Sequence, residues 1–261
     1  MDIEKYYQYT AVSSLNASLI SCIPIILLTF VFIGIHSSFT YFLLILPFLF
    51  YSIASFTHYY IQKKKGRKTV EVMIPGKVKS ILETKTTVLT FLPAPSLRLG
   101  IYTGEGTKVG EIRDMKFSAI RWYLPYFLDS LYAKSYGFYN TNNELQYSFT
   151  IKKDVIEIRN KAKHPISEIK ECPTSKKSVK LFYYSEKCIV MRKSMTYTDY
   201  HFEREEGAEL AQIKKGWMPK NWTTRLRDSN FPLLTIDHHA SDKEIIHIYA
   251  IITKIFAYTN H

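Results

Sequence analysis

The first quarter of the chain is apolar almost without interruption, and the remainder is not. Residues 15–61 contain no Asp, Glu, Lys or Arg, and they divide into two apolar stretches, Ala17–Ile35 and Phe39–Ile61. Each stretch has about 20 residues, which is enough for a helix to cross a hydrocarbon core of roughly 30 Å. Only His36-Ser37-Ser38 separates them. The pattern therefore predicts a tight hairpin of two transmembrane helices.

A signal peptide and a soluble helical hairpin both fit this apolar region less well than a membrane anchor does. A signal peptide has a basic start and an apolar core of roughly 7–15 residues, whereas residues 1–16 include Asp2 and Glu4 and the apolar region is far longer. A soluble helical hairpin would show polar residues at a helical period. No such period is present in residues 17–61, so we interpret the region as a membrane anchor.

The apolar region ends abruptly at a basic run, which predicts the orientation of the anchor. Cytoplasmic flanks of membrane helices are enriched in Lys and Arg. Because both ends of a hairpin lie on one side, residues 1–16, the linker 62–69 and everything after it are predicted to be cytoplasmic. We therefore expect a cell-membrane protein with two spans and both termini in the cytoplasm. The basic residues are Lys63, Lys64, Lys65, Arg67 and Lys68.

Beyond the basic run, short segments of β-branched and aromatic residues alternate with turn residues every 8–12 positions. This spacing is typical of an antiparallel sandwich or barrel, and the absence of alternating helices excludes a nucleotide-binding parallel sheet. We expect about 10–12 strands within a single domain, residues 70–261. The aromatic segment 117–132 fits either a helix or a loop. The predicted hairpins turn at residues 104–106, 140–143, 163–165, 185–187 and 205–207.

The chain ends in a predicted helix, residues 242–258. Ser241 suits the N-cap position and Glu244 the third helical position, which together form a capping box. The run Ile245–Ala257 is apolar on nearly every face, so it must be buried on most of its surface. At 13 residues, with Lys254 inside it, it is too short to span a membrane. We therefore predict an α+β fold in which a barrel closes around this helix.

The last section of the chain resembles a known family. An aromatic strand and a return strand (201–216) are followed by Trp217-Met218-Pro219-Lys220-Asn221-Trp222, then by Asp228-Ser229-Asn230-Phe231-Pro232, a strand, and the helix opening on Ser241. This order is similar to that of the tubby-like fold of tubby C-terminal domains, plant LURP-one-related proteins and phospholipid scramblases. It also resembles tubby-like domains attached to membrane segments in low-GC Gram-positive bacteria. The resemblance covers roughly Val70–Tyr258 and implies a barrel around a central helix.

Two departures limit what the resemblance implies. The span of animal scramblases is thought to be the C-terminal helix, whereas the anchor here is N-terminal and doubled. Asp237 and Asp242 lack the number and spacing of an EF-hand calcium loop. Calcium-activated scrambling is therefore not expected, and the phosphoinositide site of tubby proteins does not map onto residues of this chain.

The soluble part is strongly basic. Beyond residue 62 the chain has 34 Lys and Arg against 21 Asp and Glu, a net charge of +13. Such a domain, held beside anionic lipid, is attracted to the membrane surface, although a solvated basic surface accounts for the charge equally well. Nucleic acid is not an expected partner, because basic and acidic residues are interspersed rather than segregated. The three cysteines have no CxxC spacing and are expected to be structural.

The sequence offers no support for an enzyme, a metal site or a cofactor. The most catalytic-looking cluster is Asp237-His238-His239 with Asp242, Glu244 and His247 close behind. Adjacent histidines on a strand point to opposite faces, and a single Glu-x-x-His pair is only half of a di-iron site. We expect these residues to be structural. Nucleophile elbows, phosphate-binding loops and dinucleotide motifs are absent from the sequence.

Two basic groups are the candidate binding residues. The juxtamembrane group named above can attract anionic lipid, although setting the topology is a sufficient role for it. The second group interleaves cations with tryptophans, as a loop that contacts headgroups would. Its alternative is a solvated turn whose tryptophans pack on the barrel rim. The second group is Lys214, Lys215, Trp217, Lys220, Trp222, Arg225 and Arg227.

The function expected from these observations is non-enzymatic. We predict a membrane-anchored protein whose cytoplasmic tubby-like domain contacts anionic phospholipid headgroups. The alternative is a protein-interaction module that docks another membrane protein through the barrel edge or through residues 117–132. Lipid translocation along the hairpin is least favoured, because it requires a polar groove between the spans.

Overall fold

The structure is a computed structural model that describes residues 2–35, 39–70, 80–116, 134–172, 174, 178–194 and 199–259. The chain divides near residue 72 into two compact units, one helical and one built mainly of strands. The aromatic segment 117–132 lies outside the described residues.

The helical unit consists of α1 (Ile3–Ile35) and α2 (Phe39–Val70). Both helices extend past the predicted spans: α1 begins 14 residues before Ala17, and α2 continues through the basic run. With 33 and 32 residues, each helix is about 50 Å long, which exceeds the roughly 30 Å of a hydrocarbon core. The hydrophobic pattern identifies only the apolar part of each helix, and each helix continues beyond that part into polar residues.

The surface of the helical unit is largely apolar. Large apolar side chains such as Ile20, Leu27 and Phe50 are more than half exposed. Windows within Ile3–Val31 and Leu43–Thr69 are only 11% and 0% buried. A core helix of a soluble protein would bury these side chains. The structure thus contains two helices long and apolar enough to cross a membrane.

Polar and small residues line the contact between α1 and α2. Ser14 Oγ lies 2.8 Å from His58 Nδ1, and Ser18 Oγ lies 3.0 Å from Ser52 Oγ. Small and hydrogen-bonding residues at such contacts let membrane helices approach closely. The polar groups of the hairpin are therefore used to join its two helices.

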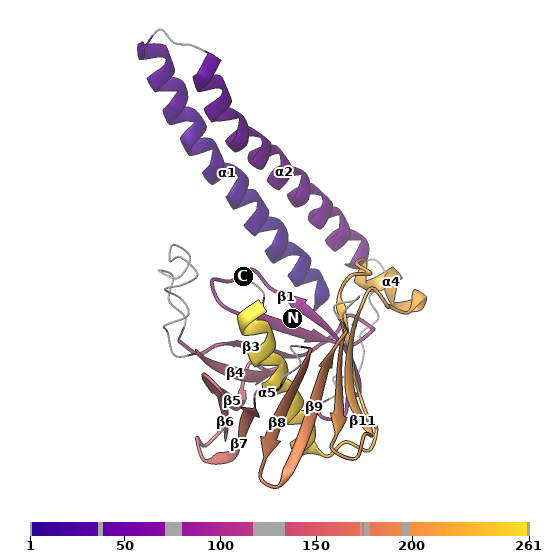
Figure 1. Cartoon of the computed structure of the whole chain (residues 1–261). Coiled ribbons are helices and arrows are strands. Elements are labelled where there is room, and N and C mark those ends of the chain that lie inside the picture. Colours follow the sequence, from indigo (N-terminus) through magenta and orange to yellow (C-terminus); the bar gives the residue numbers. More distant parts are fainter. Residues whose placement is uncertain are drawn as a thin grey trace. The chain divides into compact units, whose positions relative to one another are not determined.

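The second unit is a closed antiparallel barrel of twelve strands in which each strand pairs with its sequence neighbours and β1 pairs with β12 (Figure 1). The predicted fold class and strand number are confirmed. The strands are β1 (Thr86–Phe91), β2 (Arg98–Tyr102), β3 (Lys108–Asp114), β4 (Lys134–Asn140), β5 (Leu145–Lys152), β6 (Val155–Asn160), β7 (Pro165–Cys172), β8 (Val179–Tyr184), β9 (Lys187–Lys193), β10 (Tyr200–Arg204), β11 (Glu209–Lys215) and β12 (Pro232–Ile236).

The five predicted hairpins are the pairs β2–β3, β4–β5, β6–β7, β8–β9 and β10–β11. Their turns use backbone conformations that glycine adopts freely: Gly106 has φ +82° and Gly207 has φ +84°. The strand β1 was not among the predicted hairpins. It closes the barrel by pairing with β12 on one side and β2 on the other.

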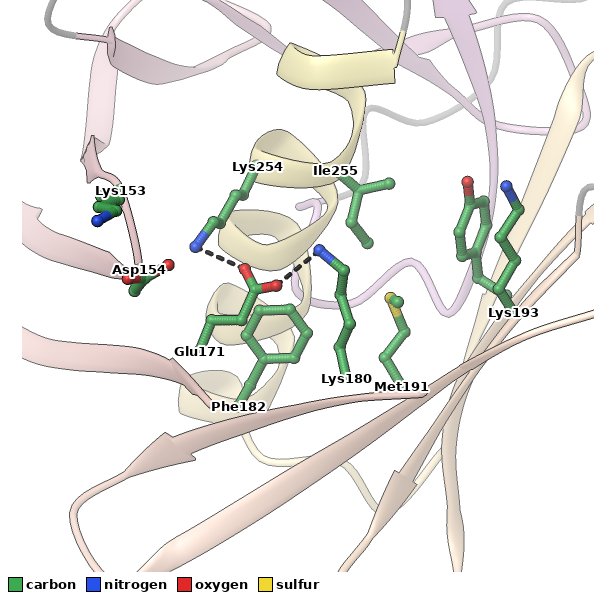
Figure 2. Close-up of a pocket in the computed structure, with 10 residues that line it drawn as sticks. Lys153, Asp154, Glu171, Lys180, Phe182, Met191, Lys193, Lys254 and Ile255 are labelled. Atoms are coloured by element: carbon green, nitrogen blue, oxygen red, sulfur yellow. Dashed lines mark hydrogen bonds and ion pairs between the residues drawn. The ribbon is translucent and has the colours of Figure 1, made fainter. Parts of the chain in front are cut away.

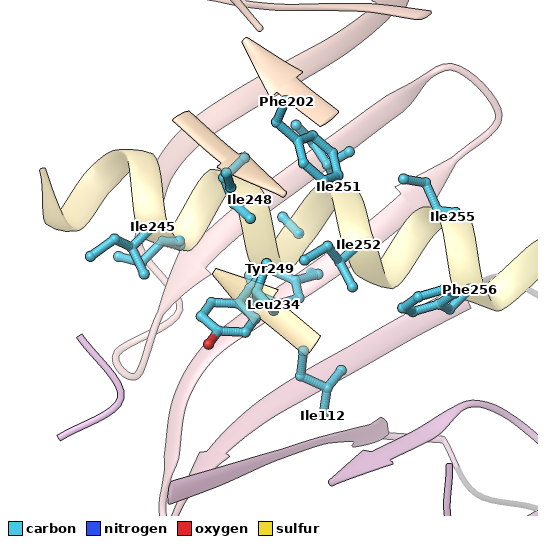
Figure 3. Close-up of a cluster of buried hydrophobic side chains, with 14 of the residues drawn as sticks. Ile112, Phe202, Leu234, Ile245, Ile248, Tyr249, Ile251, Ile252, Ile255 and Phe256 are labelled. Atoms are coloured by element: carbon cyan, nitrogen blue, oxygen red, sulfur yellow. The ribbon is translucent and has the colours of Figure 1, made fainter. Parts of the chain in front are cut away.

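The barrel wraps the C-terminal helix α5 (Asp242–Thr259). Every residue from Ile245 to Ala257 is buried, and all twelve strands contribute side chains to the same core. Figure 3 shows the side chains of α5 packed against Ile112, Phe202 and Leu234 of three strands. The predicted capping box is present, because Ser241 N–H donates to Glu244 Oε2 at 2.8 Å and Glu244 N–H donates to Ser241 Oγ at 3.4 Å. The prediction that the terminal helix is a core helix is therefore confirmed.

The two ends of the barrel can be named from α5. At its carboxyl end, the Lys134 ammonium of β4 donates to the Ala257 carbonyl at 3.0 Å, so the first residue of β4 lies there. Because neighbouring strands are antiparallel, the connections that follow β5, β7 and β9 share this end. We call it the α5-C end and the opposite one the α5-N end.

Candidate functional site

The second predicted basic group lies in the connection between β11 and β12. Part of it is helical rather than a loop, since α4 (Lys220–Leu226) forms between the two strands and carries Trp222 and Arg225. The helix begins after Pro219, and its last residue, Leu226, is buried. Proline suits the entry to a helix because it has no N–H to satisfy, which is the local signal for this helix.

The two tryptophans of this group have different surroundings. Trp222 lies over the β2–β3 turn so closely that a Cβ atom on Gly104 would be 2.0 Å from its ring. Trp217 follows Gly216, whose φ is +82°, and is 64% exposed. Trp222 therefore matches the alternative of packing on the barrel rim, whereas Trp217 projects from the surface.

The cations of the group divide in the same way. Lys215 and Lys220 are exposed on either side of Trp217, whereas Lys214, Arg225 and Arg227 are half-buried. Arg227 ends α4 in a left-handed conformation with φ +51°. The part of the predicted group that is open to a ligand is therefore Lys215, Trp217 and Lys220, which we call the Trp217 loop.

The juxtamembrane basic group lies on the last turns of α2. Lys63, Lys64, Arg67 and Lys68 are exposed, while Lys65 is half-buried. The Lys63 ammonium donates to the Tyr59 hydroxyl at 2.7 Å. Because a helix holds them, these cations form a fixed band around one end of the hairpin rather than a flexible linker.

A group that the sequence analysis did not identify lies inside the α5-C end of the barrel. Side chains two apart on a strand share a face. Glu171 follows the buried Ile169, Lys180 precedes the buried Phe182, and both therefore point inward. Lys193 follows the buried Met191 in the same way. The inner face of the barrel is thus apolar at its centre and charged at this end.

These inward charges form an ion cluster with α5 (Figure 2). Glu171 accepts a hydrogen bond from Lys180 at 2.6 Å and forms an ion pair with Lys254, also at 2.6 Å. Burial acts to raise the pKa of Glu171, but the hydrogen bonds and charges of the two lysines hold it below its ordinary value. The carboxylate is therefore ionised at neutral pH, and the cluster carries a net charge of +1.

The cluster lines a cavity of about 410 Å³ that opens at this end. Its wall includes the apolar side chains of Phe182, Met191 and Ile255, and its charged lining has four lysines against two carboxylates (Figure 2). Within the described part of the chain, neither Lys153 nor Lys193 forms an ion pair. The lining residues are Lys153, Asp154, Glu171, Lys180, Phe182, Met191, Lys193, Tyr200, Lys254 and Ile255.

The acidic and histidine residues considered as a metal site lie at the α5-N end, where they are otherwise engaged. Arg204 donates to Glu244 at 2.9 Å and to Asp237 at 3.1 Å. His247 is 3% exposed, its ring centre lies 4.2 Å from that of Tyr184, and burial lowers its pKa to about 4. Among the described residues, no group of three metal-ligating side chains comes together.

The cavity was missed because its residues come from distant parts of the sequence. The signal available was the interruption of an inward apolar pattern by charge at Glu171, Lys180 and Lys193. The signal can be recognised only when the strand register is known, because the register shows which residues point into the barrel. The aromatic segment 117–132, with Trp122, Tyr123, Tyr126 and Phe127 as predicted docking residues, lies outside the described residues.

The fold defines a class of protein, a helical hairpin joined to a closed twelve-stranded barrel around one helix. No protein-family model and no curated protein sequence matches the chain. Among solved structures, it is similar to a protein of Arabidopsis thaliana determined by X-ray crystallography. The TM-score is 0.41 and the identity 9%, over 65% of this chain and 89% of the plant protein. At this distance the similarity assigns neither family nor activity.

Proposed function

We propose that this chain is a non-enzymatic, membrane-anchored protein whose cytoplasmic barrel, related to tubby-like domains, contacts anionic phospholipid headgroups through the Trp217 loop. The observation that carries the proposal is the 64% exposure of Trp217 between the exposed Lys215 and Lys220. An indole suits the headgroup layer, and adjacent cations gain about 1 kcal/mol each beside an anionic surface.

Because the anchor tethers the barrel, weak contacts between the Trp217 loop and the headgroups are sufficient to orient it. Nine residues separate the end of α2 at Val70 from Ser80, the first described residue of the barrel unit, and such a segment reaches at most about 35 Å. Because the barrel and the hairpin belong to one chain, the anchor gives the barrel a high effective concentration relative to the bilayer. In this proposal the basic band of α2 marks the cytoplasmic face.

The test uses the full chain in nanodiscs made from neutral lipid or from neutral lipid mixed with phosphatidylglycerol. Tryptophan emission is measured with lipids brominated near the headgroup, and the difference between the wild type and Trp217→Phe isolates Trp217. We expect quenching of Trp217 in anionic discs at about 0.1 M salt and its loss at about 1 M, where the screening length falls from about 10 Å to about 3 Å.

Matched variants locate the contact. Lys215→Gln with Lys220→Gln is expected to abolish the quenching, whereas Lys161→Gln with Lys187→Gln, two exposed lysines at the α5-N end, leaves it unchanged. Equal emission of Trp217 in neutral and anionic discs would contradict headgroup contact. That result would favour docking of another membrane protein, the alternative function.

A further inference from the structure

The cavity at the α5-C end has features of a ligand site that the Trp217 loop does not explain. Its volume of about 410 Å³ is within the range of small-molecule pockets, about 300–1,000 Å³. Barrels commonly close such an end with apolar side chains that continue the core. Here the inward positions at the end of the strands hold Glu171, Lys180 and Lys193 instead.

The buried ion cluster gives the cavity a fixed charge. Charges removed from water are costly and gain little net stability from pairing, so Lys254, which is 6% exposed, is not explained by stability alone. Glu171 holds Lys180 and Lys254 in place by one contact each. An ammonium has three donors, so Lys180, whose side chain is 45% exposed, keeps donors for a ligand.

Two more cations stand at the rim. Lys153 and Lys193 are exposed, and neither is in an ion pair within the described residues. The Lys193 ammonium lies 5.9 Å from the centre of the Tyr200 ring. Four lysines against Asp154 and Glu171 leave the lining at +2, which suits a ligand with two negative charges.

We propose that this cavity binds a phosphate monoester. Lys180 binds the dianionic phosphate beside Glu171, Lys153 and Lys193 attract it from opposite sides of the cavity, and its organic part lies against Phe182, Met191 and Ile255 (Figure 2). Lysine is a regular phosphate ligand that acts as a point charge. Inorganic phosphate lacks an organic part to cover the apolar wall, so the ester is bound more tightly.

The same chemistry occurs in a soluble phosphate ester and in the headgroup of phosphatidic acid, and the experiment separates these sources. The full chain is purified in neutral maltoside micelles and titrated calorimetrically. The probes are inorganic phosphate, glycerol 3-phosphate and dihexanoyl phosphatidic acid, with glycerol and dihexanoyl phosphatidylcholine as counterparts without a phosphate monoester. All three phosphates are expected to bind, dihexanoyl phosphatidic acid more tightly than inorganic phosphate because its acyl chains cover the apolar wall, and the counterparts are expected not to bind.

Variants test whether the cavity is the site. Lys153→Gln with Lys193→Gln removes two exposed charges, so it should leave the melting temperature unchanged while weakening the monoester affinity at least about tenfold. The control is Lys161→Gln with Lys187→Gln, which removes the same net charge at the α5-N end. The control should bind like the wild type.

Each outcome decides the proposal. Binding of glycerol 3-phosphate, with or without binding of phosphatidic acid, supports a soluble ligand, and binding of phosphatidic acid alone supports a lipid headgroup. The proposal is overturned if neither ester binds, or if the cavity variant and the control lose affinity equally. The proposal does not depend on the Trp217 loop, because the assay contains no bilayer and Lys215 and Lys220 are unchanged. Its failure and that of headgroup contact are therefore separate results.

Discussion

The two ends of the barrel carry ion clusters of opposite composition. At the α5-N end, Arg204 lies between Glu244 at 2.9 Å and Asp237 at 3.1 Å. At the α5-C end, Glu171 lies between Lys180 and Lys254, at 2.6 Å from each. One end therefore holds a cation between two carboxylates, and the other holds a carboxylate between two cations.

The dipole of α5 accounts for part of this difference. The amino end of a helix favours negative charge and the carboxyl end favours positive charge. Glu244 in the first turn, and Lys254 and Lys134 near the last, follow that rule. The dipole does not require Lys153 and Lys193, which line a cavity without ion-pair partners among the described residues. Neither the helix dipole nor an ion pair therefore explains the charges of these two lysines, which is why we assign them to ligand binding in the proposal above.

The largest expected effect comes from breaking the cluster at the α5-N end. Arg204→Met leaves Glu244 and Asp237 without their cation, and we expect a loss of about 2 kcal/mol, since the arginine is about three-quarters buried. Thermal unfolding of the full chain in detergent should show a midpoint lower by roughly 4–8 °C. The control is Arg192→Met, an arginine whose side chain is 56% exposed and pairs with Glu203, so its effect should be under about 1 kcal/mol.

The acid dependence of that effect sharpens the test. Burial acts to raise the pKa of Glu244, but hydrogen bonds from Arg204 and Ser241 lower it to about 2 from 4.5. The folded state therefore favours the carboxylate, and this stability is present above pH 4.5 and lost as the pH falls toward 2. The difference between wild type and Arg204→Met should narrow over that range. A constant difference would contradict the ion-pair mechanism.

The next effect is a pH dependence at the same end. Burial lowers the pKa of His247 to about 4 from 6.5, and the groups nearest it are Tyr184, Glu244 and Lys243. Below pH 6.5 the unfolded chain binds a proton that the folded chain does not, so stability falls as the pH drops toward 4. We expect a loss on the order of 2 kcal/mol.

Replacing the imidazole isolates this contribution. In His247→Phe, unfolding midpoints measured between pH 7 and pH 5 should be nearly constant, because the ring that titrates in the unfolded chain is gone. If the variant loses stability as steeply as the wild type across this interval, another group is responsible.

A smaller effect is expected at the α5-C end. Lys254→Met removes a buried cation, but Glu171 keeps Lys180 and is itself partly exposed, so the loss should be about 1 kcal/mol. A double-mutant cycle with Glu171→Gln measures the coupling directly. If Lys254→Met lowered the unfolding free energy more than Arg204→Met does, our inference that the α5-N cluster contributes more to stability would be wrong.

The smallest effect is expected in the Trp217 loop. Trp217→Ala should change the unfolding free energy by less than about 0.5 kcal/mol, because the side chain is 64% exposed. Trp222→Ala, which uncovers Gly104, should cost more, about 1 kcal/mol. Denaturant unfolding of both variants checks this contrast, and equal losses would contradict the different roles of the two tryptophans.

The sequence predicted most of the barrel because its signals are local. A turn at Gly207, a capping box at Ser241 and Glu244, and a helix apolar on nearly every face each lie within a few residues. The limits of the long helices were harder to predict. Hydrophobicity ends with the lipid-compatible segment, whereas Gln62 and the lysines after it remain good helix formers, so α2 continues to Val70.

The cavity was beyond sequence prediction because it depends on long-range pairing. Glu171 meets Lys254, a residue far along the chain, only after the intervening strands have formed and the helix has entered the barrel. The separation of Trp217 from Trp222 has a similar cause, since the packing partner of Trp222 is Gly104, on another hairpin. Composition and spacing identified the basic and aromatic residues, and tertiary contacts decided which of them remain exposed.

Closure of the barrel also restricts how it can be recognised. A sheet with open edges can recruit an extended peptide by adding it as another strand, and the same edges promote aggregation. Here β1 and β12 pair with each other, so the backbone offers no template for a thirteenth strand. A partner of the described part of the barrel would therefore be recognised by side chains rather than by an added strand.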